Sequence, residues 1–298
     1  MKILISGSRG LVGATLQQYL DNAGHCVIPL LRKRPTAGQV GVHWNPISNI
    51  VDTDAIEGAD AVVHLAGENI AQGRWTKAKK QLIRDSRVDG TQLLSAALSG
   101  LQNKPQVLVC ASAIGYYGDR DDEVLTEFST RGSGYLPDVC RDWETASEIA
   151  ANCGIRVVLL RYGVILSANG GALAKMLKPF KMGVGGKIGG GRQYMSWIAI
   201  DDAVGVIVHA IENDELNGPV NAVSPNPVTN LEYTKTLGRV ISRPTLFPMP
   251  ALAARAAFGQ MADDLLLASS RVEPAKLKKS GYVFQHPELE GALKHLLT

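Results

Sequence analysis

The sequence predicts an α/β fold, with a doubly wound parallel sheet and a smaller, mostly helical lobe in the C-terminal part. Three observations support this prediction. Short apolar runs alternate with amphipathic runs in the first half of the chain, a glycine-rich turn follows the first apolar run, and the alternation stops after about residue 163. Strands that alternate with helices pair in parallel through right-handed crossovers. Ligands of such sheets bind outside the carboxyl ends of the strands.

Taken in chain order, the expected strands are Lys2–Ser6, Cys26–Leu31, Val42–Trp44, Asp60–Leu65, Val107–Ala111, Arg156–Tyr162 and Val220–Val223. The expected helices are Leu11–Ala23, Lys77–Ser99, Asp138–Cys153 and Asp201–Glu212. In the first helix the apolar residues recur at 3.6 spacing, and Gly24 is a natural stop. Pro29 cannot donate to a central ladder, so we expect a bulge in the second strand.

The change of pattern divides the chain. Residues 1–165 are expected to form a dinucleotide-binding domain, to which residues 197–224 return with a last strand. Residues 166–196, which are dense in glycine and show no strand–helix period, are assigned with residues 225–298 to a substrate or C-terminal lobe.

Composition excludes several classes of protein. Of the 298 residues, 45% are hydrophobic and 20% charged, which excludes intrinsic disorder. A net charge of +3 does not indicate a nucleic-acid partner. No apolar run reaches the ~20 residues of a membrane span, and the first strand turns glycine-rich too soon for a signal peptide. We therefore expect a cytoplasmic protein without a nucleic-acid or membrane partner.

Four cysteines are present, and they form no Cys-x-x-Cys pair. No histidine stands at zinc spacing, so we expect no metal site. Cys26 and Cys110 lie in apolar strand-like runs, which favours buried, reduced thiols.

A glycine-rich turn, GSRGLVG, joins the first strand to the first helix. Its glycines follow the G-x-x-G-x-x-G spacing, which allows a sharp turn, a close approach of backbone N–H groups to a pyrophosphate and tight packing of helix on strand. We expect the whole turn to contact a dinucleotide through Gly7, Ser8, Arg9, Gly10, Leu11, Val12 and Gly13.

The residues that follow the second strand indicate which dinucleotide binds. Arg32, Lys33 and Arg34 stand where an NAD enzyme places an acid for the ribose 2′-hydroxyl, and no acid is nearby. Guanidinium groups suit a 2′-phosphate, and Arg9 could add to the same pocket. The turn therefore favours NADP(H), with a solvated basic turn as the alternative.

The exit of the strand at 60–65 offers a second cofactor contact. Small residues there, Ala66 and Gly67 after Leu65, would let the adenosine-ribose side of a cofactor lie against the backbone. Arg87 and Arg161 could reach the cofactor, or each could form a structural salt bridge. His64 lies inside an apolar strand and is expected to be a core residue.

Several motifs make the chain resemble the extended, epimerase-like branch of the short-chain dehydrogenase/reductase superfamily. They are GSRGLVG at 7–13, DAVVHLAG at 60–67, SAIGYYG at 112–118 and MSWIAIDDAV at 195–204. LAGENIAQGRW at 65–75 and GGRQYMSWIAIDD at 190–202 are similar to the atypical "epimerase family" subgroup. The resemblance covers almost the whole chain. It implies a Rossmann-type domain with a small C-terminal domain, and NADP(H) held by the glycine turn, Arg32, Leu65, Ala66, Arg87 and Arg161.

The catalytic motif of that superfamily, a serine followed by Tyr-x-x-x-Lys, is incomplete here. Ser112 fits the serine, but Val139 stands four residues after Tyr135, and alignment by Glu144 places Cys140 at the lysine position. A tyrosine with no cationic neighbour is a poor base at neutral pH. Two further tyrosines follow the serine and are candidate substitutes, with a structural aromatic role as the alternative: Tyr116 and Tyr117.

An arginine and a pair of acids in the segment 189–202 are further candidate site residues. Arg192, in GGGRQ, resembles the arginine that holds a substrate phosphate in sugar-nucleotide enzymes of this branch, or it is a surface arginine. Asp201 and Asp202 are adjacent on a helix, about 100° apart, so they cannot share a proton. We expect them to be the acids of a helix N-terminus that order a loop.

Two functions remain open. The chain is an NADP(H)-dependent reductase or epimerase of an unidentified small-molecule substrate, or a cofactor-sensing module that has lost its Tyr–Lys pair. By analogy with the superfamily, the 77–99 helix is a candidate homodimer contact.

Overall fold

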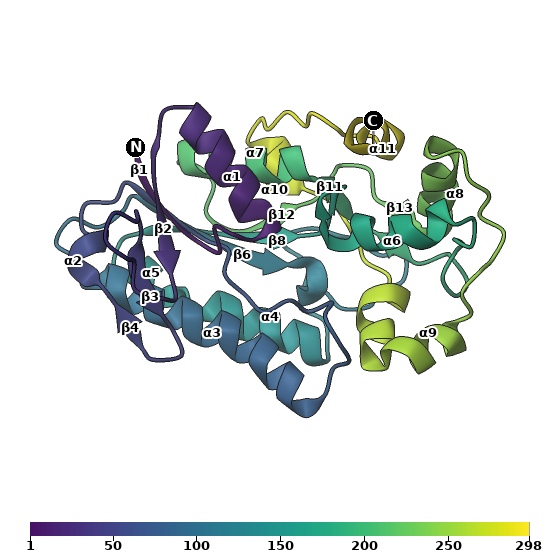
Figure 1. Ribbon diagram of the computed structural model, residues 1–298, viewed down its shortest axis with the longest axis horizontal. Helices are drawn as coiled ribbons and strands as arrows, with labels where there is room; N and C mark the ends of the chain where they lie inside the picture. The colour runs from purple at the N-terminus through teal and green to yellow at the C-terminus, as the bar shows by residue number, and fades with distance from the viewer. Residues whose placement is uncertain (298) are drawn as a thin grey trace.

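An eight-stranded sheet runs through the middle of the computed structural model, which describes residues 1–297 (Figure 1). Its strand order is β12-β8-β6-β5-β1-β2-β3-β4, and every neighbouring pair is parallel except β3 and β4. The strands are β1 (Lys2–Ser6), β2 (Cys26–Leu31), β3 (Val42–Asn45), β4 (Ile50–Val51), β5 (Ala61–His64), β6 (Val107–Ala113), β8 (Arg156–Tyr162) and β12 (Gly218–Ala222). The predicted doubly wound sheet is confirmed, including the last strand that rejoins it.

Helices cover both faces of this sheet (Figure 1). One face carries α1 (Leu11–Asn22) and α7 (Ile200–Glu212); the other carries α3 (Lys77–Ser99), α4 (Tyr135–Thr145) and α5 (Glu148–Asn152). Alternate residues of a strand point to opposite faces. Ile3 and Ile5 accordingly pack with Leu16 of α1 in one core, whereas Leu4 packs with Leu94 of α3 in another. A short helix, α2 (Thr53–Ile56), precedes β5.

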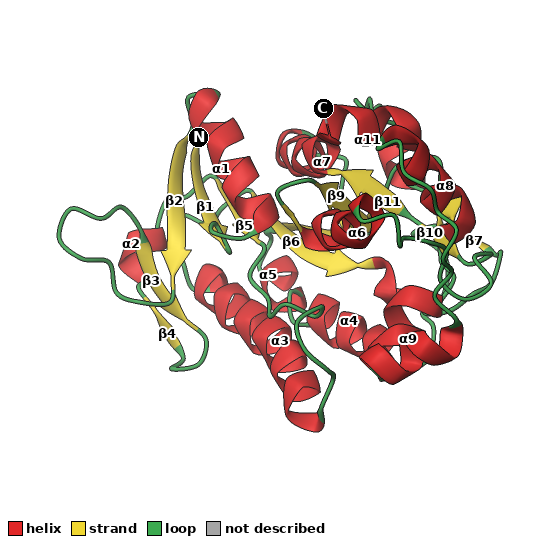
Figure 2. Cartoon of the chain, turned by 45° about the vertical axis from the view of Figure 1, so that its right-hand side comes forward, coloured by secondary structure: helices red, strands yellow, loops and turns green. Residues whose placement is uncertain are grey.

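A third group of elements lies beyond one end of the sheet, as Figure 2 shows. Its strands form three small pairs: β9 (Val164–Ser167) with β11 (Trp197–Ala199), β10 (Tyr194–Met195) with β13 (Val228–Thr229), and β7 (Val124–Leu125) with β14 (Arg271–Val272). Its helices are α6 (Gly171–Lys181), α8 (Asn230–Val240), α9 (Ala251–Phe258) and α11 (Leu289–Leu297). Three of them, α6, α8 and α11, share a core around Trp197 and Tyr233. The chain also contains α10 (Ala275–Lys279), a 3₁₀ turn at Ile114–Tyr116 and a π-helical turn at Ala262–Leu267.

Two sequence predictions about secondary structure were wrong. The register of β1 on β2 continues through Ile5 and Pro29 without an extra residue, so there is no bulge. β3 pairs only with Leu30 and Leu31, and Pro29 thus has a neighbouring strand on one side, the setting in which proline is tolerated. The helix expected over 138–153 is two helices, because the Ser147 hydroxyl donates to the Glu144 carbonyl at 2.7 Å and competes with the helical bond.

The glycine-dense segment contains regular structure that the sequence analysis did not predict. β9 and α6 form there, and α6 buries Leu173, Leu177 and Phe180 at helical spacing. The expectation of buried cysteines is wrong for Cys26, which is exposed; all four thiols are free. Within residues 1–297, no helix is long and apolar enough to cross a membrane.

Candidate functional site

The turn between β1 and α1 has no room for side chains at two of its glycines. Gly7 has a φ of +71°, and a Cβ there would lie 2.9 Å from the Ala66 nitrogen. A Cβ at Gly13 would lie 2.3 Å from the Gly7 carbonyl oxygen. Gly10 precedes α1 in an extended conformation and provides no side-chain cap. The first-turn N–H groups of α1 therefore keep their hydrogen-bonding capacity for an anion.

The side chains of this turn divide by exposure. Ser8 is buried, Leu11 and Val12 are half-buried, and Arg9 is exposed. Arg9 is thus the one side chain among these four that is fully free to reach a bound phosphate group.

Ser6 ties the carboxyl ends of β1 and β5 together. Its Oγ accepts hydrogen bonds from the N–H groups of Leu65, at 3.1 Å, and Ala66, at 3.2 Å. It must then donate its own proton to His64 Nδ1, which lies 2.6 Å away. His64 is fully buried and neutral, since burial lowers its pKa to about 4. It is a core residue, as the sequence predicted, and it fixes the backbone on which a cofactor would lie.

β1 and β5 are neighbours where the chain reverses its direction of winding. From β1 the sheet extends to β2 and β3 on one side, and from β5 to β6, β8 and β12 on the other. Such a switch point is where open α/β sheets bind ligands. The glycine turn and residues 65–67 therefore meet at the expected place.

The basic turn lies beside this switch point. Arg32 and Lys33 follow directly on the end of β2, the neighbour of β1, and both side chains are exposed. The next residues, through Gly41, include no acid. This arrangement is suited to a 2′-phosphate and lacks the carboxylate that an NAD enzyme uses to hold the ribose 2′-hydroxyl.

Arg87 lies against the exit of β5. A Cβ at Gly67 would be 3.3 Å from its guanidinium carbon, and its Nη1 donates to the carbonyls of Glu68 and Ile83, each at 3.0 Å. The guanidinium also lies 5.0 Å from the Trp143 ring centroid. Burial lowers the pKa of Arg87, but the group remains a cation at neutral pH.

A buried network joins three more of the sequence-predicted site residues: Ser112, Tyr117 and Arg161. Arg161 donates to both carboxylate oxygens of Glu144, at 2.8 and 2.7 Å, and to the Tyr117 hydroxyl at 3.0 Å. Ser112 donates to Glu144 at 2.6 Å, and Tyr117 donates to the Asn221 side chain at 2.7 Å. Tyr117 and Arg161 are 0% and 2% exposed. These polar groups are therefore already paired with one another.

Tyr116 differs from its neighbour. Its ring lies under the Arg161 guanidinium, 3.5 Å from the guanidinium carbon to the ring centroid, and meets the Tyr117 ring edge-on. The side chain is half-buried, and its hydroxyl makes no hydrogen bond to any of residues 1–297. Among the candidate tyrosines it is the one whose proton is not committed elsewhere.

The other positions of the superfamily motif are not equipped for proton transfer. The Tyr135 hydroxyl donates to the Lys80 carbonyl at 2.7 Å, and burial raises its pKa to about 12. Cys140 is 3% exposed, and burial, followed by the charge of Glu144, raises its thiol pKa to about 12. A neutral thiol thus occupies the position of the expected lysine.

Arg192 lines a cavity of about 450 Å³ outside the sheet. The other lining residues are Asp119, Asp121, Asp122, Gly190, Gln193, Tyr194, Leu267 and Ser269. The Arg192 side chain is exposed. The cavity therefore presents one cation and several carboxylates to a polar molecule.

The sequence analysis missed Ser6 and Asn221 and gave Glu144 no function. Ser6 and Asn221 are polar residues in otherwise apolar runs, which was the available signal, whereas Glu144 lies in a charged stretch that gave none. Their partners lie on other elements, and only the fold shows those pairings.

A glycine turn closed on a second strand, an uncapped helix and a basic turn at the switch point define the class of dinucleotide-binding α/β proteins. The chain belongs to the NAD dependent epimerase/dehydratase family, whose model matches residues 3–223. Residues 249–296 match a domain of unknown function, DUF1731. The resemblance noted in the sequence is thereby confirmed.

Similar proteins share the full length of the chain. "Epimerase family protein Mb2239" of Mycobacterium bovis is 45% identical over 296 residues, 99% of this chain and 97% of the relative. Human "Epimerase family protein SDR39U1" is 33% identical over 301 residues, 100% of each chain. The crystal structure of the human protein (isoform 2) with NADPH superposes with a TM-score of 0.90 over 99% of both chains, at 32% identity. A nucleoside-diphosphate sugar epimerase of Corynebacterium glutamicum gives a TM-score of 0.82 at 39% identity, covering 100% of this chain and 58% of that one.

Proposed function

We propose that the chain binds NADP(H) and acts as a reductase or epimerase at a carbinol or carbonyl carbon of a small or nucleotide-linked compound. The observation that carries this proposal is the glycine turn at the β1–β5 switch point. Neither Gly7 nor Gly13 has space for a Cβ, and the basic turn without an acid lies beside them. The NADPH in the structure of the human relative supports the same cofactor.

Each part of the site has a role toward the cofactor. The N–H groups of residues 7–13 and the N-terminus of α1 would hold the pyrophosphate. Arg32 and Lys33 would hold the 2′-phosphate, and Arg9 of the glycine turn would add to the same pocket. Leu65, Ala66 and Gly67 would support the ribose side, and Arg87 keeps that backbone in place through Glu68. When bound, the nicotinamide supplies the hydride chemistry.

Tyr116 is the residue we assign to proton transfer. Its phenol would donate a proton to the carbonyl oxygen during reduction and take it back from the hydroxyl in the reverse direction. Arg161 fixes the ring from its face, and Glu144 fixes Arg161. Ser112, Tyr117 and Arg161, which the sequence placed at substrate or cofactor, are then positioning residues, because their polar groups are used by one another.

The test is NADPH oxidation by the purified protein against a panel of aldehydes and ketones. We expect turnover with at least one compound and a loss of about 10²–10⁴-fold in kcat for Tyr116→Phe, with NADPH binding unchanged. Tyr135→Phe is the matched control and should keep its activity. Wild-type turnover that survives Tyr116→Phe would remove Tyr116 as the proton donor.

A second function, cofactor sensing without catalysis, is favoured by Cys140. Its buried thiol leaves the lysine position without an ammonium group. Tight NADPH binding with no turnover of any compound would support this alternative. Cys140→Lys distinguishes a degraded enzyme, in which the lysine would restore activity, from one that uses a different mechanism. The position is buried near the charges of Glu144, Arg87 and Arg161, so we expect the lysine to destabilise the fold and not to create activity.

We also propose how the rest of the chain serves this function. Residues 1–165 and 197–224 would hold the cofactor, while 166–196 and 225–298 would hold the substrate. Arg192 supports this division, because it faces the 450 Å³ cavity and could hold an anionic substrate group. The carboxylates that line the same cavity would suit a substrate that also carries a positive charge or a bound cation.

Assembly and location are further parts of the proposal. Homodimerisation through α3 is supported by Leu82, which is 48% exposed on that helix. Light scattering of the wild type and of Leu82→Glu tests it.

A cytoplasmic location is supported by the four free thiols, of which Cys26 and Cys153 are exposed. Because the Arabidopsis relative is named as chloroplastic, the property that we propose for this chain is a reducing compartment.

A further inference from the structure

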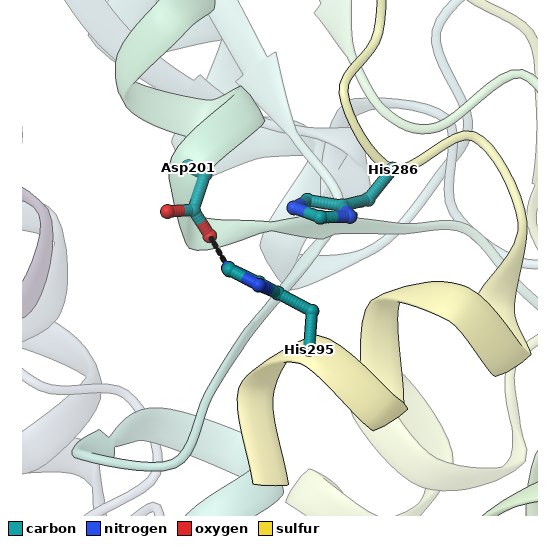
Figure 3. A group of neighbouring side chains, drawn as sticks. All are labelled: Asp201, His286 and His295. Atoms are coloured by element: carbon teal, nitrogen blue, oxygen red, sulfur yellow. Dashed lines mark ion pairs between the residues drawn. The ribbon is translucent and has the colours of Figure 1, made fainter. Parts of the chain in front are cut away.

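Three metal-ligating side chains meet where the C-terminal segment crosses the start of α7 (Figure 3). They are Asp201 in the first turn of α7, His286 in the loop before α11, and His295 in the last turn of α11. One ligand atom from each lies within 4.8 Å of the others. His295 Nε2 is 3.3 Å from Asp201 Oδ2, and the two imidazole rings stack with centroids 4.2 Å apart.

The carboxylate of Asp201 is not satisfied by hydrogen bonds. Its Oδ2 is buried and accepts none from residues 1–297, so its one close partner is the His295 ring. Buried polar oxygens are normally paired. The orphaned oxygen points toward the space between the histidines (Figure 3), as a ligand atom would.

The scaffold around the three side chains is firmly held. Asp202, which is fully buried, accepts hydrogen bonds from the N–H groups of Gln285, at 2.8 Å, and His286, at 2.9 Å. The Ser224 hydroxyl donates to the Pro287 carbonyl at 2.7 Å. Leu289 and Leu293 of α11 are buried in the third core. The backbone that carries both histidines is therefore fixed relative to α7.

We propose that Asp201, His286 and His295 bind a divalent transition-metal ion of the Zn²⁺ type. Zn²⁺ takes imidazole nitrogen and carboxylate oxygen at about 2.0–2.2 Å in a tetrahedral arrangement, which places its ligand atoms roughly 3.3 Å apart. The Asp201–His295 distance is already 3.3 Å. The other ligand atoms lie within 4.8 Å of one another, and on binding the His286 and His295 rings would rotate to bring their nitrogens to the ion. A water molecule takes the fourth position on the open side, where the His295 side chain is 49% exposed.

The ion would act as a clamp between the C-terminal helix and α7. Its charge is balanced by Asp201 and by the carbonyl end of α11, from whose last turn His295 projects. The histidines are far from Asp201 in the sequence, which is why no zinc spacing is visible there. This site is separate from the cofactor turn and does not depend on the proposed enzymatic function.

The test uses the full chain, freed of metal with a chelator and titrated with ZnCl₂ by calorimetry. We expect one equivalent to bind and to raise the melting temperature by several degrees when the free metal is in large excess over its Kd. Co²⁺ in place of Zn²⁺ should give the visible absorption bands of a tetrahedral site. Asp201→Asn, His286→Gln and His295→Gln should each weaken binding at least tenfold and remove these bands.

His25→Gln is the matched control, because His25 lies elsewhere on the molecule and is not one of the three ligands. It should bind Zn²⁺ as wild type does. No binding to the wild type would show that the group is only a His–Asp ion pair and would overturn the proposal, as would wild-type affinity in all three ligand variants. NADPH binding, measured in parallel, should be the same in every variant.

Discussion

Glu144 accepts two hydrogen bonds from Arg161, from Nε at 2.8 Å and from Nη2 at 2.7 Å. Their side chains are 10% and 3% exposed. The pair spans from α4 to β8, and it holds the guanidinium against the Tyr116 ring. Because a buried ion must be paired, the two charges depend on one another, and the position of Tyr116 depends on both.

Removing the Glu144 charge should therefore destabilise the fold strongly. For Glu144→Gln we expect the free energy of unfolding to fall by about 3–5 kcal/mol, since Arg161 is left as an uncompensated buried charge. Urea denaturation measures the loss. Glu148→Gln, on the exposed side of the neighbouring helix, should change stability by no more than about 0.5 kcal/mol. A similarly small effect for Glu144→Gln would mean that the pair does not organise this region.

The basic turn should set the cofactor preference. Calorimetric titration should show tighter binding of NADP(H) than of NAD(H), and Arg32→Ala should reduce that preference by about ten- to a hundredfold. This range corresponds to the loss of one charge-assisted contact, about 1.5–3 kcal/mol.

Arg34→Ala, also exposed, is the matched control for Arg32→Ala. An unchanged preference in Arg32→Ala would shift the phosphate site to Arg9 or Lys33. Equal affinities of the wild type for the two cofactors would contradict the assignment of the turn altogether.

Gly10→Val should separate binding from folding. A Cβ at Gly10 meets only the Gly7 carbonyl oxygen, at 3.2 Å, and the residue is exposed. The valine side chain would therefore obstruct an approaching pyrophosphate while leaving most of the packing intact. Thermal melts with and without NADPH should show a near-native melting temperature and no gain from the cofactor. Ala14→Val, one turn into α1, should keep the gain; a gain in Gly10→Val would place the phosphates elsewhere.

The alternating pattern of the first half was enough to predict the sheet, because each strand and helix there has its own local periodicity. The segment 163–196 was not predictable in the same way. Its flanking glycines masked a short helix whose Leu173, Leu177 and Phe180 are buried only because α8 and α11 provide a core. The glycine turn and the basic turn are each a short, continuous stretch of sequence, so a cofactor site could be predicted from them.

The network behind Tyr116 could not be predicted from the sequence. Ser112, Tyr117 and Arg161 each have the chemistry of a site residue, and their burial became clear only when Glu144 and Asn221 were brought against them. The same holds for the group at Asp201, whose partners come from the far end of the chain.

The burial of His64 makes stability depend on pH. His64 is fully buried, and its pKa is about 4 instead of 6.5 because burial disfavours the charged ring. Between these two values the unfolded chain binds a proton that the folded chain does not. Stability therefore rises with pH through this window and is lost as the pH falls from about 6.5 toward 4. The full shift corresponds to a loss of about 3 kcal/mol in the free energy of unfolding.

Urea denaturation between pH 4 and about 7 measures this loss of stability. His64→Gln should be less stable at pH 7 and should lose most of this dependence, whereas His25→Gln, at an exposed terminus contact, should keep it. An unchanged pH profile in His64→Gln would assign the acid sensitivity to other groups.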